Sequence, residues 1–478
     1  MFDAKSYSNP LVDRYASSTM VGLWSPQKKF STWRKLWVAL AESEMELGLK
    51  ITPDQISQLR STVDDIDFDR AASFERELRH DVMAHVHTWR EQVPDAGGIV
   101  HLGATSCYVT DNTDAILLRD GMEQVLKRLR GVIANLRTFC LAEAEKPCVG
   151  YTHFQPAQFT TVGKRASLWL QDLVLDHTEL EQARDAIRFR GVKGTTGTQD
   201  SFMKLFDGDE DKVEELDRRV TEKMGFDRRF IVTGQTYTRK MDSRCITALS
   251  AVAQSLHKFS NDIRLLCHLR EIEEPFEKKQ IGSSAMAYKR NPMRCERIGS
   301  LSRFLISMTE NTAYTEAAQW LERTLDDSAN RRLTLPLAFM AADAILIIAA
   351  NVTSGLVVRD AVIERHLKEH VPFIASEELM MRAAAKGGDR QELHEVIRTH
   401  AMAAADKMKN EGGANDFLER LMGDDAFALD REEAESLLVA SRFIGRAPAQ
   451  VRHFIAEEVD PILAKHQDDG DDVVELRV

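Results

Sequence analysis

The sequence predicts an all-α protein built around a bundle of long helices. Two segments repeat apolar residues at alternating steps of three and four, the spacing of one helix face, over roughly thirty residues each. Strand-like alternation of apolar and polar residues is scarce, so little or no sheet is expected. At 478 residues the chain suffices for several structural units. We expect three domains: an N-terminal helical domain (1–105), the long-helix bundle (106–358) and a C-terminal helical domain (359–478).

The first long helix is predicted between Asn112, a candidate cap, and Pro147, which would end it. Its apolar face comprises Leu118, Met122, Val125, Leu129, Val132, Leu136 and Phe139. The second runs from Cys245 to Leu266, and further helices are expected over about 161–190, 292–314 and 329–356. Apolar faces of this length are best buried against neighbouring subunits, which favours an oligomer over the alternative of one monomeric bundle.

The most apolar stretch, Leu333 to Ala350, has roughly the length of a bilayer span, but Pro336 and Asp343 interrupt it. We therefore predict a buried bundle helix and no membrane association. The first seventeen residues lack the basic start and apolar run of a secretory signal, so export is not expected.

The overall charge argues against a polyanionic partner. The chain has 63 basic and 75 acidic residues, a formal net charge of −12, which disfavours general affinity for nucleic acid or anionic lipid. Its six cysteines form no C-x-x-C pair, as a reducing compartment permits, so a cytoplasmic location is expected. The final residues, HQDDGDDVVELRV, form an acidic tail that we expect to fray.

Two polar segments early in the chain are candidates for function. LRHDVMAHVH (78–87) places His80, His85 and His87 near Asp81, but the histidine spacings of five and two do not fit a helical zinc pair, so no metal is expected. In HLGATSCYVTDNTD (101–114) the Thr105 and Ser106 hydroxyls precede a helix start and can hold a carboxylate or phosphate. Simple helix capping is the alternative.

Two later segments carry groups suited to acid–base chemistry. In GYTHFQPAQFTT (150–161), Thr152 and His153 precede a proline and then a predicted helix, and a histidine can protonate a leaving amine. QIGSSAMAYKRNPMRCER (280–297) has the composition of a mobile lid, with Lys289 and Asn291 able to face a developing oxyanion. A structural histidine and a plain surface loop are the alternatives.

Together these segments resemble the fumarase/aspartase superfamily. The signature loop G-S-S-x-M-P-x-K-x-N-P of that superfamily appears as GSSAMAYKRNP (282–292). The segments RHDVMAHVH, HLGATSCYV, THFQPAQ, RGVKGTTGT (190–198), TGQTYTRK (233–240) and RTLDDSANRR (323–332) are similar to its adenylosuccinate lyase branch, in the animal form. The resemblance covers the chain from about residue 10 to about residue 460. One departure is Ala287, which stands where the family loop has proline and implies a more mobile lid.

The resemblance implies a three-domain fold whose central helices assemble into a core of about 20 helices in a homotetramer, with active sites shared between subunits. It also implies the anti-elimination of fumarate from adenylosuccinate, giving AMP, and from the succinyl-aminoimidazole-carboxamide ribotide (SAICAR), giving the carboxamide ribotide (AICAR). No cofactor and no metal are implied.

The resemblance also implies the residues of the site. The catalytic set is Ser283 as base, His153 as acid, Glu296 orienting that acid, Lys289 stabilising the carbanion and His80 positioning the substrate. The substrate-binding set is Thr105, Ser106, Gln235 and Asn291 at the carboxylates, Arg14, Tyr15, Arg297, Arg323, Ser328 and Arg332 at the phosphate end, and Arg79, Asp81 and Thr152 beside them.

Two other functions remain open at the level of the sequence. Argininosuccinate lyase, fumarase and aspartase share the signature loop, but their substrates lack a phosphate, and the arginines at 14, 323 and 332 discriminate against them. A catalytically silent, lens-type structural protein on the same fold is the other, and the presence of His153, Ser283 and Lys289 argues against it.

Overall fold

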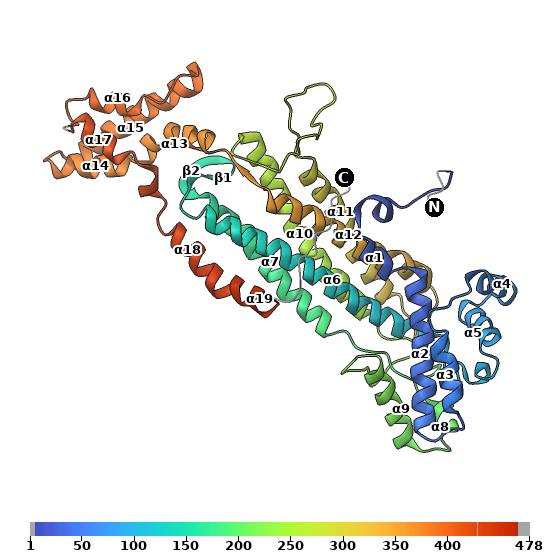
Figure 1. Cartoon of the computed structure of the whole chain (residues 1–478). Helices are drawn as coiled ribbons and strands as arrows, with labels where there is room; N and C mark the ends of the chain where they lie inside the picture. Colours follow the sequence, from blue (N-terminus) through green and yellow to red (C-terminus); the bar gives the residue numbers. More distant parts are fainter. Residues whose placement is uncertain (1–4, 428, 467–478) are drawn as a thin grey trace.

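Five long helices run side by side through the centre of the protein, as Figure 1 shows for this computed structural model, which describes residues 5–427 and 429–466. They are α6 (Ser106–Ala142), α7 (Val162–Asp185), α10 (Lys240–Leu269), α11 (Met293–Ala317) and α12 (Asp327–Ser354). Helix α10 packs against α7, α11 and α12, and α6 packs against α7 and α12. The predicted all-α class with a central long-helix bundle is confirmed.

Shorter elements flank the bundle. Before it come η1 (Leu11–Tyr15), α1 (Ser18–Leu23), α2 (Pro26–Glu46), α3 (Pro53–Ser61), α4 (Phe68–Leu78), α5 (Asp81–Gln92) and η2 (Gly97–Ile99), and α8 (Asp200–Leu205) and α9 (Glu210–Lys223) lie between α7 and α10. After it come α13 (Asp360–Ile374), α14 (Ser376–Ala385), α15 (Arg390–Asp406), η3 (Lys407–Glu411), α16 (Phe417–Met422), α17 (Arg431–Leu437), η4 (Ala440–Phe443), α18 (Ala447–Phe454), η5 (Ile455–Val459) and α19 (Asp460–Lys465).

The start of α6 differs from the prediction. Its N-cap residue is Thr105, which has an extended backbone, and not Asn112. Asn112 lies about two turns further in and is buried. Its amide donates to the carbonyl of Tyr108 at 2.8 Å and its side-chain oxygen accepts from Gly191 N at 3.0 Å. A polar side chain that can cap a helix is used here to tie α6 to the segment after α7. The helix ends at Ala142, five residues before Pro147.

Helix α12 is the candidate membrane span of the sequence. It is long and apolar enough to cross a bilayer, but 78% of its most apolar stretch is buried inside the protein. Its Asp343 pairs with Arg128 of α6 and accepts a hydrogen bond from Ser17 N at 2.7 Å. The helix is therefore a core element of the bundle, as its sequence predicted.

The few strands form two small antiparallel sheets. Strands β1 (Pro147–Thr152) and β2 (Gln155–Thr161) make a hairpin, where the sequence had suggested a loop leading into a helix. Thr161 then caps α7 by accepting a hydrogen bond from Lys164 N at 3.0 Å. Strands β3 (Ile272–Glu273) and β4 (Val357–Val358) join the ends of α10 and α12.

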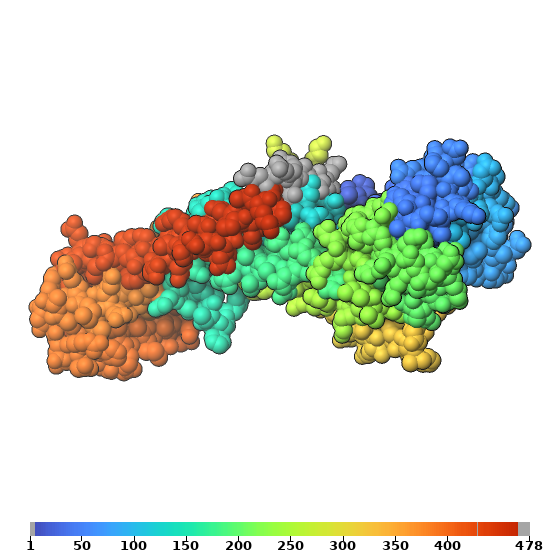
Figure 2. Space-filling model, turned by 90° about the horizontal axis from the view of Figure 1, so that it is seen from below, coloured from blue at the N-terminus to red at the C-terminus, as the bar shows by residue number. Residues whose placement is uncertain are grey.

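The C-terminal region has a core of its own. Apolar side chains between Ala375 and Ala434, including Leu379, Leu393 and Phe417, form a cluster separate from the bundle core. The chain then returns, and α18 and α19 lie along the bundle surface (Figure 2). The division into 1–105, 106–358 and 359–478 stays a prediction, and the acidic tail from residue 467 onward lies outside the described residues.

Candidate active site

The first group of predicted site residues surrounds the N-terminus of α6. The Oγ of Ser106 lies 3.4 Å from Nε2 of His80, and the amide of Gln235 donates to Oγ1 of Thr105 at 3.4 Å. Arg332 donates to Oδ2 of Asp81 at 2.7 Å. We call these six residues the Ser106 cluster. The hydroxyls, the imidazole and the guanidinium face partly open solvent at a helix N-terminus, an arrangement suited to an anion.

Local backbone geometry aims His80 at Ser106. His80 is the N-cap of α5, and its Nδ1 accepts a hydrogen bond from Met83 N at 3.3 Å. In a neutral ring this bond leaves the proton on Nε2, the nitrogen nearest Ser106. The preceding Arg79 ends α4 in a left-handed conformation with φ of 55°, which turns the chain sharply into α5.

Hydrogen bonds to its backbone hold Gln235 in position. The buried guanidinium of Arg190 donates to the carbonyl of Gln235 at 2.8 Å and to that of Gly194 at 2.9 Å. Gln235 N in turn donates to the carbonyl of Glu322 at 3.0 Å. A hollow of about 320 Å³ lies beside this contact, between residues 232–239 and 316–323, and Arg323 is part of its wall.

The second group is at the tip of the β1–β2 hairpin. Thr152 pairs with Gln155, so His153 and Phe154 alone form the turn, and both have left-handed backbones with φ of 54° and 57°. A two-residue turn of this kind normally takes asparagine and glycine, because positive φ is costly for other residues. The strain presents an exposed imidazole at the outermost point of the hairpin, which is a reason to suspect function.

The third group lies on the loop between β3 and α11, which projects from the bundle in Figure 1. The Oγ of Ser283 accepts hydrogen bonds from the backbone N–H groups of Ala285 at 3.3 Å and Met286 at 3.1 Å. Asn291 donates to the carbonyl of Gly282 at 2.8 Å and closes the loop at its base. Two N–H donors stabilise negative charge on Oγ, as a base requires.

The remaining predicted site residues lie on α11, near the start of α12 and in η1. Glu296 and Arg297 are in the first turns of α11, next to the loop, whereas Ser328 and Arg323 lie near the start of α12, at the far end of the antiparallel pair. Arg323 donates to Asp327 at 2.7 Å. Arg14 and Tyr15 are in η1, which packs against α12.

One chain does not bring the three groups together. Ser106 begins α6 and the hairpin follows its end, and 37 helical residues span about 55 Å at 1.5 Å per residue. The hairpin and α5 accordingly lie near opposite ends of the long-helix bundle in Figure 1. Within residues 5–427 and 429–466, no hydrogen bond or ion pair joins His153 to Ser283 or to Glu296. A site that uses all three groups needs more than one chain.

The histidines of LRHDVMAHVH do not form a metal site. His85 is buried against the Phe30 ring, with ring centroids 3.8 Å apart, and His87 lies beside Phe74. Burial lowers the pKa of His85 to about 4, and the nearby Arg34 and Lys29 charges act in the same direction. Of the three histidines, only His80 belongs to the Ser106 cluster.

The sequence matches two family models. One described as lyase covers residues 24–304, and one described as adenylosuccinate lyase C-terminus covers residues 372–454. Adenylosuccinate lyase of Saccharomyces cerevisiae is 52% identical over 98% of both chains. That of Schistosoma mansoni is 46% identical over 98% of both, and that of Pyrococcus abyssi is 32% identical over 83% of this chain and 87% of its own.

The chain belongs to the adenylosuccinate lyase family.

Solved structures agree with the fold of that family. The 3-carboxy-cis,cis-muconate lactonizing enzyme of Pseudomonas putida superposes with a TM-score of 0.81 at 21% identity, over 95% of this chain and all of its own. A fumarate lyase of Mesorhizobium sp. BNC1 gives a TM-score of 0.78 at 22% identity, with the same coverage. The predicted membership of the fumarase/aspartase superfamily and its fold are therefore confirmed.

A buried charge network, which the sequence did not reveal, joins α6 to the start of α12. Arg239 bridges Asp111 of α6 at 3.0 Å and Asp327 of α12 at 2.7 Å. Burial alone would raise the pKa of Asp111, but the charges of Arg239, Arg331 and Arg190 together outweigh it, and the pKa lies below its ordinary value. The segments TGQTYTRK and RTLDDSANRR contain Arg239 and Asp327, but both segments are mostly polar, and nothing in them indicates that these two charges are buried.

Glu271 is a second residue missed from the sequence. Its buried carboxylate accepts a hydrogen bond from the Tyr151 hydroxyl at 3.0 Å, and Nδ1 of His366 lies 2.8 Å from the same oxygen. Arg165 contacts the other oxygen at 3.4 Å. Burial and the Glu271 charge raise the pKa of Tyr151, which keeps its hydroxyl protonated as the donor. The network fixes the strand that leads to Thr152 and His153.

Proposed function

We propose that this protein is a carbon–nitrogen lyase that eliminates fumarate from adenylosuccinate, giving AMP, and from SAICAR, giving AICAR, in purine nucleotide biosynthesis. The observation that carries the proposal is the 52% identity with an adenylosuccinate lyase over 98% of the chain. The three groups of site residues supply the acid, the base and the anion-binding side chains that this reaction needs.

The chemistry divides between the loop and the hairpin. Ser283 Oγ, held by two backbone N–H groups, removes the proton from the carbon next to a substrate carboxylate. The electron pair left on that carbon spreads into the carboxylate, where Lys289 and Asn291 stabilise the charge. The C–N bond then breaks, its electron pair goes to nitrogen, and His153 donates a proton there. Glu296 is proposed to orient the imidazole.

The Ser106 cluster is proposed to receive the anionic substrate. Thr105, Ser106 and Gln235 hold the carboxylates, and His80 positions the substrate beside them. The phosphate is bound at the cationic positions Arg14, Tyr15, Arg297, Arg323, Ser328 and Arg332, with Arg79, Asp81 and Thr152 at the edges of the site. No cofactor takes part in these steps.

We further propose that the active form is a homotetramer whose sites combine groups from different chains. The length of α6 between the Ser106 cluster and the hairpin supports this arrangement. The bundle also exposes apolar side chains: Leu168 and Leu175 of α7 are 46% and 58% exposed, and Leu265 of α10 is 44% exposed. Leu168 and Leu175 are seven residues apart and share one helix face, which suits packing against another helix.

The expectations about partners and cellular location also form part of the proposal. The net charge of −12 supports small-molecule substrates and gives no basis for nucleic-acid or membrane partners. A cytoplasmic location is proposed because six cysteines are unpaired, five of them buried.

The test combines an absorbance assay for conversion with light scattering for mass. We expect fumarate release from adenylosuccinate and SAICAR, and none from argininosuccinate, malate or aspartate, by a species of four times the chain mass. If the protein converts neither succinylated purine nucleotide, the proposed function is wrong. A fully active monomer would contradict the proposal that each active site combines groups from different chains.

A further inference from the structure

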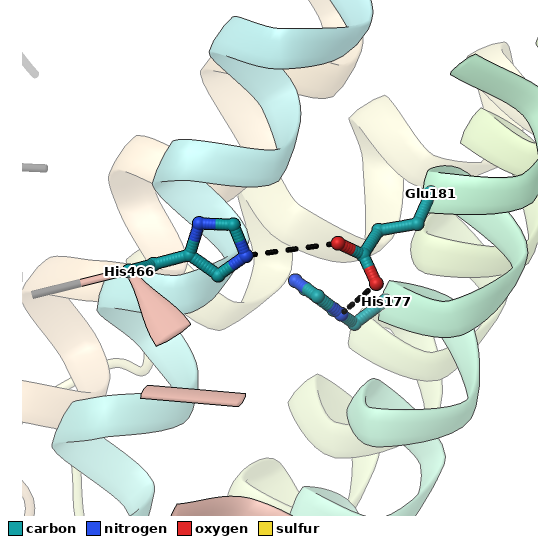
Figure 3. Close-up of side chains that lie close together, drawn as sticks. All are labelled: His177, Glu181 and His466. Atoms are coloured by element: carbon teal, nitrogen blue, oxygen red, sulfur yellow. Dashed lines mark ion pairs between the residues drawn. The ribbon is translucent and has the colours of Figure 1, made fainter. Parts of the chain in front are cut away.

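Three potential metal ligands, none of them a predicted site residue, lie close together. His177 and Glu181 lie on α7, and His466 follows the end of α19. Figure 3 shows the two imidazole rings on either side of the Glu181 carboxylate, each with one nitrogen turned toward it. Nδ1 of His177 is 3.7 Å from Oε2 of Glu181, and Nε2 of His466 is 3.6 Å from Oε1. One ligand atom from each residue lies within 4.8 Å of the other two.

The protein leaves the polar atoms of this cluster incompletely satisfied. Nε2 of His177, Oε1 of Glu181 and Nε2 of His466 are buried and have no hydrogen-bond partner among the described residues. The His177 side chain is only 2% exposed. A buried polar atom without a partner is unfavourable, so such atoms call for an explanation. A ligand that accepts electron pairs from all three would supply it.

The ionisation of the group suits such a ligand. Burial lowers the pKa of His177 to about 4, although the Glu181 charge opposes the shift. Burial thus favours the neutral ring, which has a lone pair on one nitrogen. Neutral imidazole and carboxylate are the protonation states that bind transition metals.

The spacing of the residues suits the same ligand. His177 and Glu181 are four residues apart and so point from one face of α7. Two histidines and one carboxylate form a known zinc ligand set that leaves a fourth position to water. Zinc–nitrogen bonds of about 2.1 Å place tetrahedral ligand atoms about 3.4 Å apart, so side-chain rotations that move the ligand atoms by about an ångström close the site.

We propose that His177, Glu181 and His466 form a zinc-binding site that fastens the C-terminal helix α19 to α7. The ion would link residues 285 positions apart in the sequence, on an element that otherwise lies along the surface of the bundle. It acts as a structural clamp and takes no part in the elimination.

Two cations beside Glu181 would compete with a zinc ion for its carboxylate. Lys465 Nζ is 3.6 Å and Arg184 Nη2 is 3.8 Å from Oε1 of Glu181. The Lys465 side chain is 68% exposed and can move into solvent when an ion enters. Arg184 has other partners in Glu123 and Asp185, both at 2.8 Å. Without zinc, the cluster is an ion pair between Glu181 and these cations.

The experiment measures metal binding by the full-length, tag-free protein after treatment with a chelator. Equilibrium dialysis with Zn²⁺ alone is expected to load one ion per chain, and Co²⁺ in its place is expected to give the visible absorption of a four-coordinate site. Zinc should also raise the melting temperature, because it binds only the folded chain. Activity on adenylosuccinate is recorded separately and should not depend on the ion.

The variants locate the site. His466→Ala and Glu181→Gln alter partly exposed positions and should each lose the bound ion and the zinc-induced rise in melting temperature. His453→Ala is the matched control, because His453 is exposed on the neighbouring α18 and should bind zinc like the parent chain. Zinc stoichiometry that is unchanged in both variants, or no binding by the parent chain, would overturn the proposal and leave an ion pair only.

Discussion

At the scale of single residues, the most informative position is the turn at His153 and Phe154. Two consecutive non-glycine residues with positive φ are unusual, and each costs of order 1 kcal/mol or more. The strands on either side, and the Tyr151–Glu271 hydrogen bond next to them, hold this turn in place. This backbone strain is the cost of placing the exposed His153 imidazole at the tip of the hairpin.

His153→Asn should separate catalysis from folding. Asparagine tolerates the left-handed conformation, so the hairpin remains, but its amide cannot donate a proton at the required moment. We expect the turnover of adenylosuccinate to fall about 10²–10⁴-fold, with no loss of melting temperature. Phe154→Asn makes the same exchange one residue later and should retain activity. Near-normal turnover by the first variant would exclude His153 as the acid.

A pH dependence of stability follows from Glu44. This carboxyl is fully buried in α2, neither oxygen has a partner in the described structure, and burial raises its pKa to about 9. Between the unfolded pKa near 4.5 and this folded value, unfolding releases a proton, so the group destabilises the protein progressively as pH rises. Below the unfolded pKa the effect vanishes.

Glu44→Gln therefore should melt at a higher temperature than the parent chain at pH 8, with the difference shrinking as pH falls toward 5. Calorimetry at a series of pH values measures it. A difference that stays constant with pH would mean that Glu44 is ionised in the folded protein.

At the scale of elements, the sequence specified the long helices well and their surroundings less well. The apolar spacing predicted α6 and α10 because each buries one continuous face. It failed at the hairpin, because only Phe159 and Thr161 among residues 155–161 are buried and the segment has no alternating apolar pattern. The pairing of β1 with β2 depends on the turn and on contacts with the end of α10, which no local pattern encodes.

The Ser283 loop has a specific requirement at its base. A Cβ at Gly282 would collide with the carbonyl oxygen of Lys289, so the loop depends on a glycine there. Gly282→Ala should displace Ser283 relative to Lys289 and lower turnover about 100-fold, since misplacement by an ångström has that effect. The melting temperature should change little, because the loop is exposed.

The matched control is Gly131→Ala on α6, where a Cβ meets nothing within 4 Å. It should keep full turnover and be slightly more stable, as expected for alanine within a helix. Equal activity of the two variants would mean that the loop rearranges freely at Gly282.

At the scale of the whole molecule, the sequence predicted a set of site residues but not where they lie. The resemblance assigned His153, Ser283 and His80 to one reaction, and only the three-dimensional fold separates them along α6. The convergence of His466 on Glu181 was likewise invisible, because nothing local relates positions 285 residues apart. Position in space follows from packing between distant segments.

Mixing two inactive variants tests the division of the site between chains. His153→Asn and His80→Asn alter opposite ends of the bundle, and asparagine can replace His80 as the cap of α5. If each site takes the two residues from different chains, random mixed oligomers regain about a quarter of the parent activity. Refolding the variants together, and then separately, gives the comparison. No recovery would place both residues of a site in one chain.

The side-by-side packing of five long helices also determines which changes in length this chain can tolerate. Adding or removing one residue in the middle of α6 turns everything beyond it by about 100° and shifts it by about 1.5 Å, while α7, α10 and α12 beside it keep their old register. The hairpin at the far end would then present His153 in a different direction. Insertions and deletions should accordingly be tolerated in the joints between helices and be lethal to activity within them, even where substitutions at the same positions are harmless.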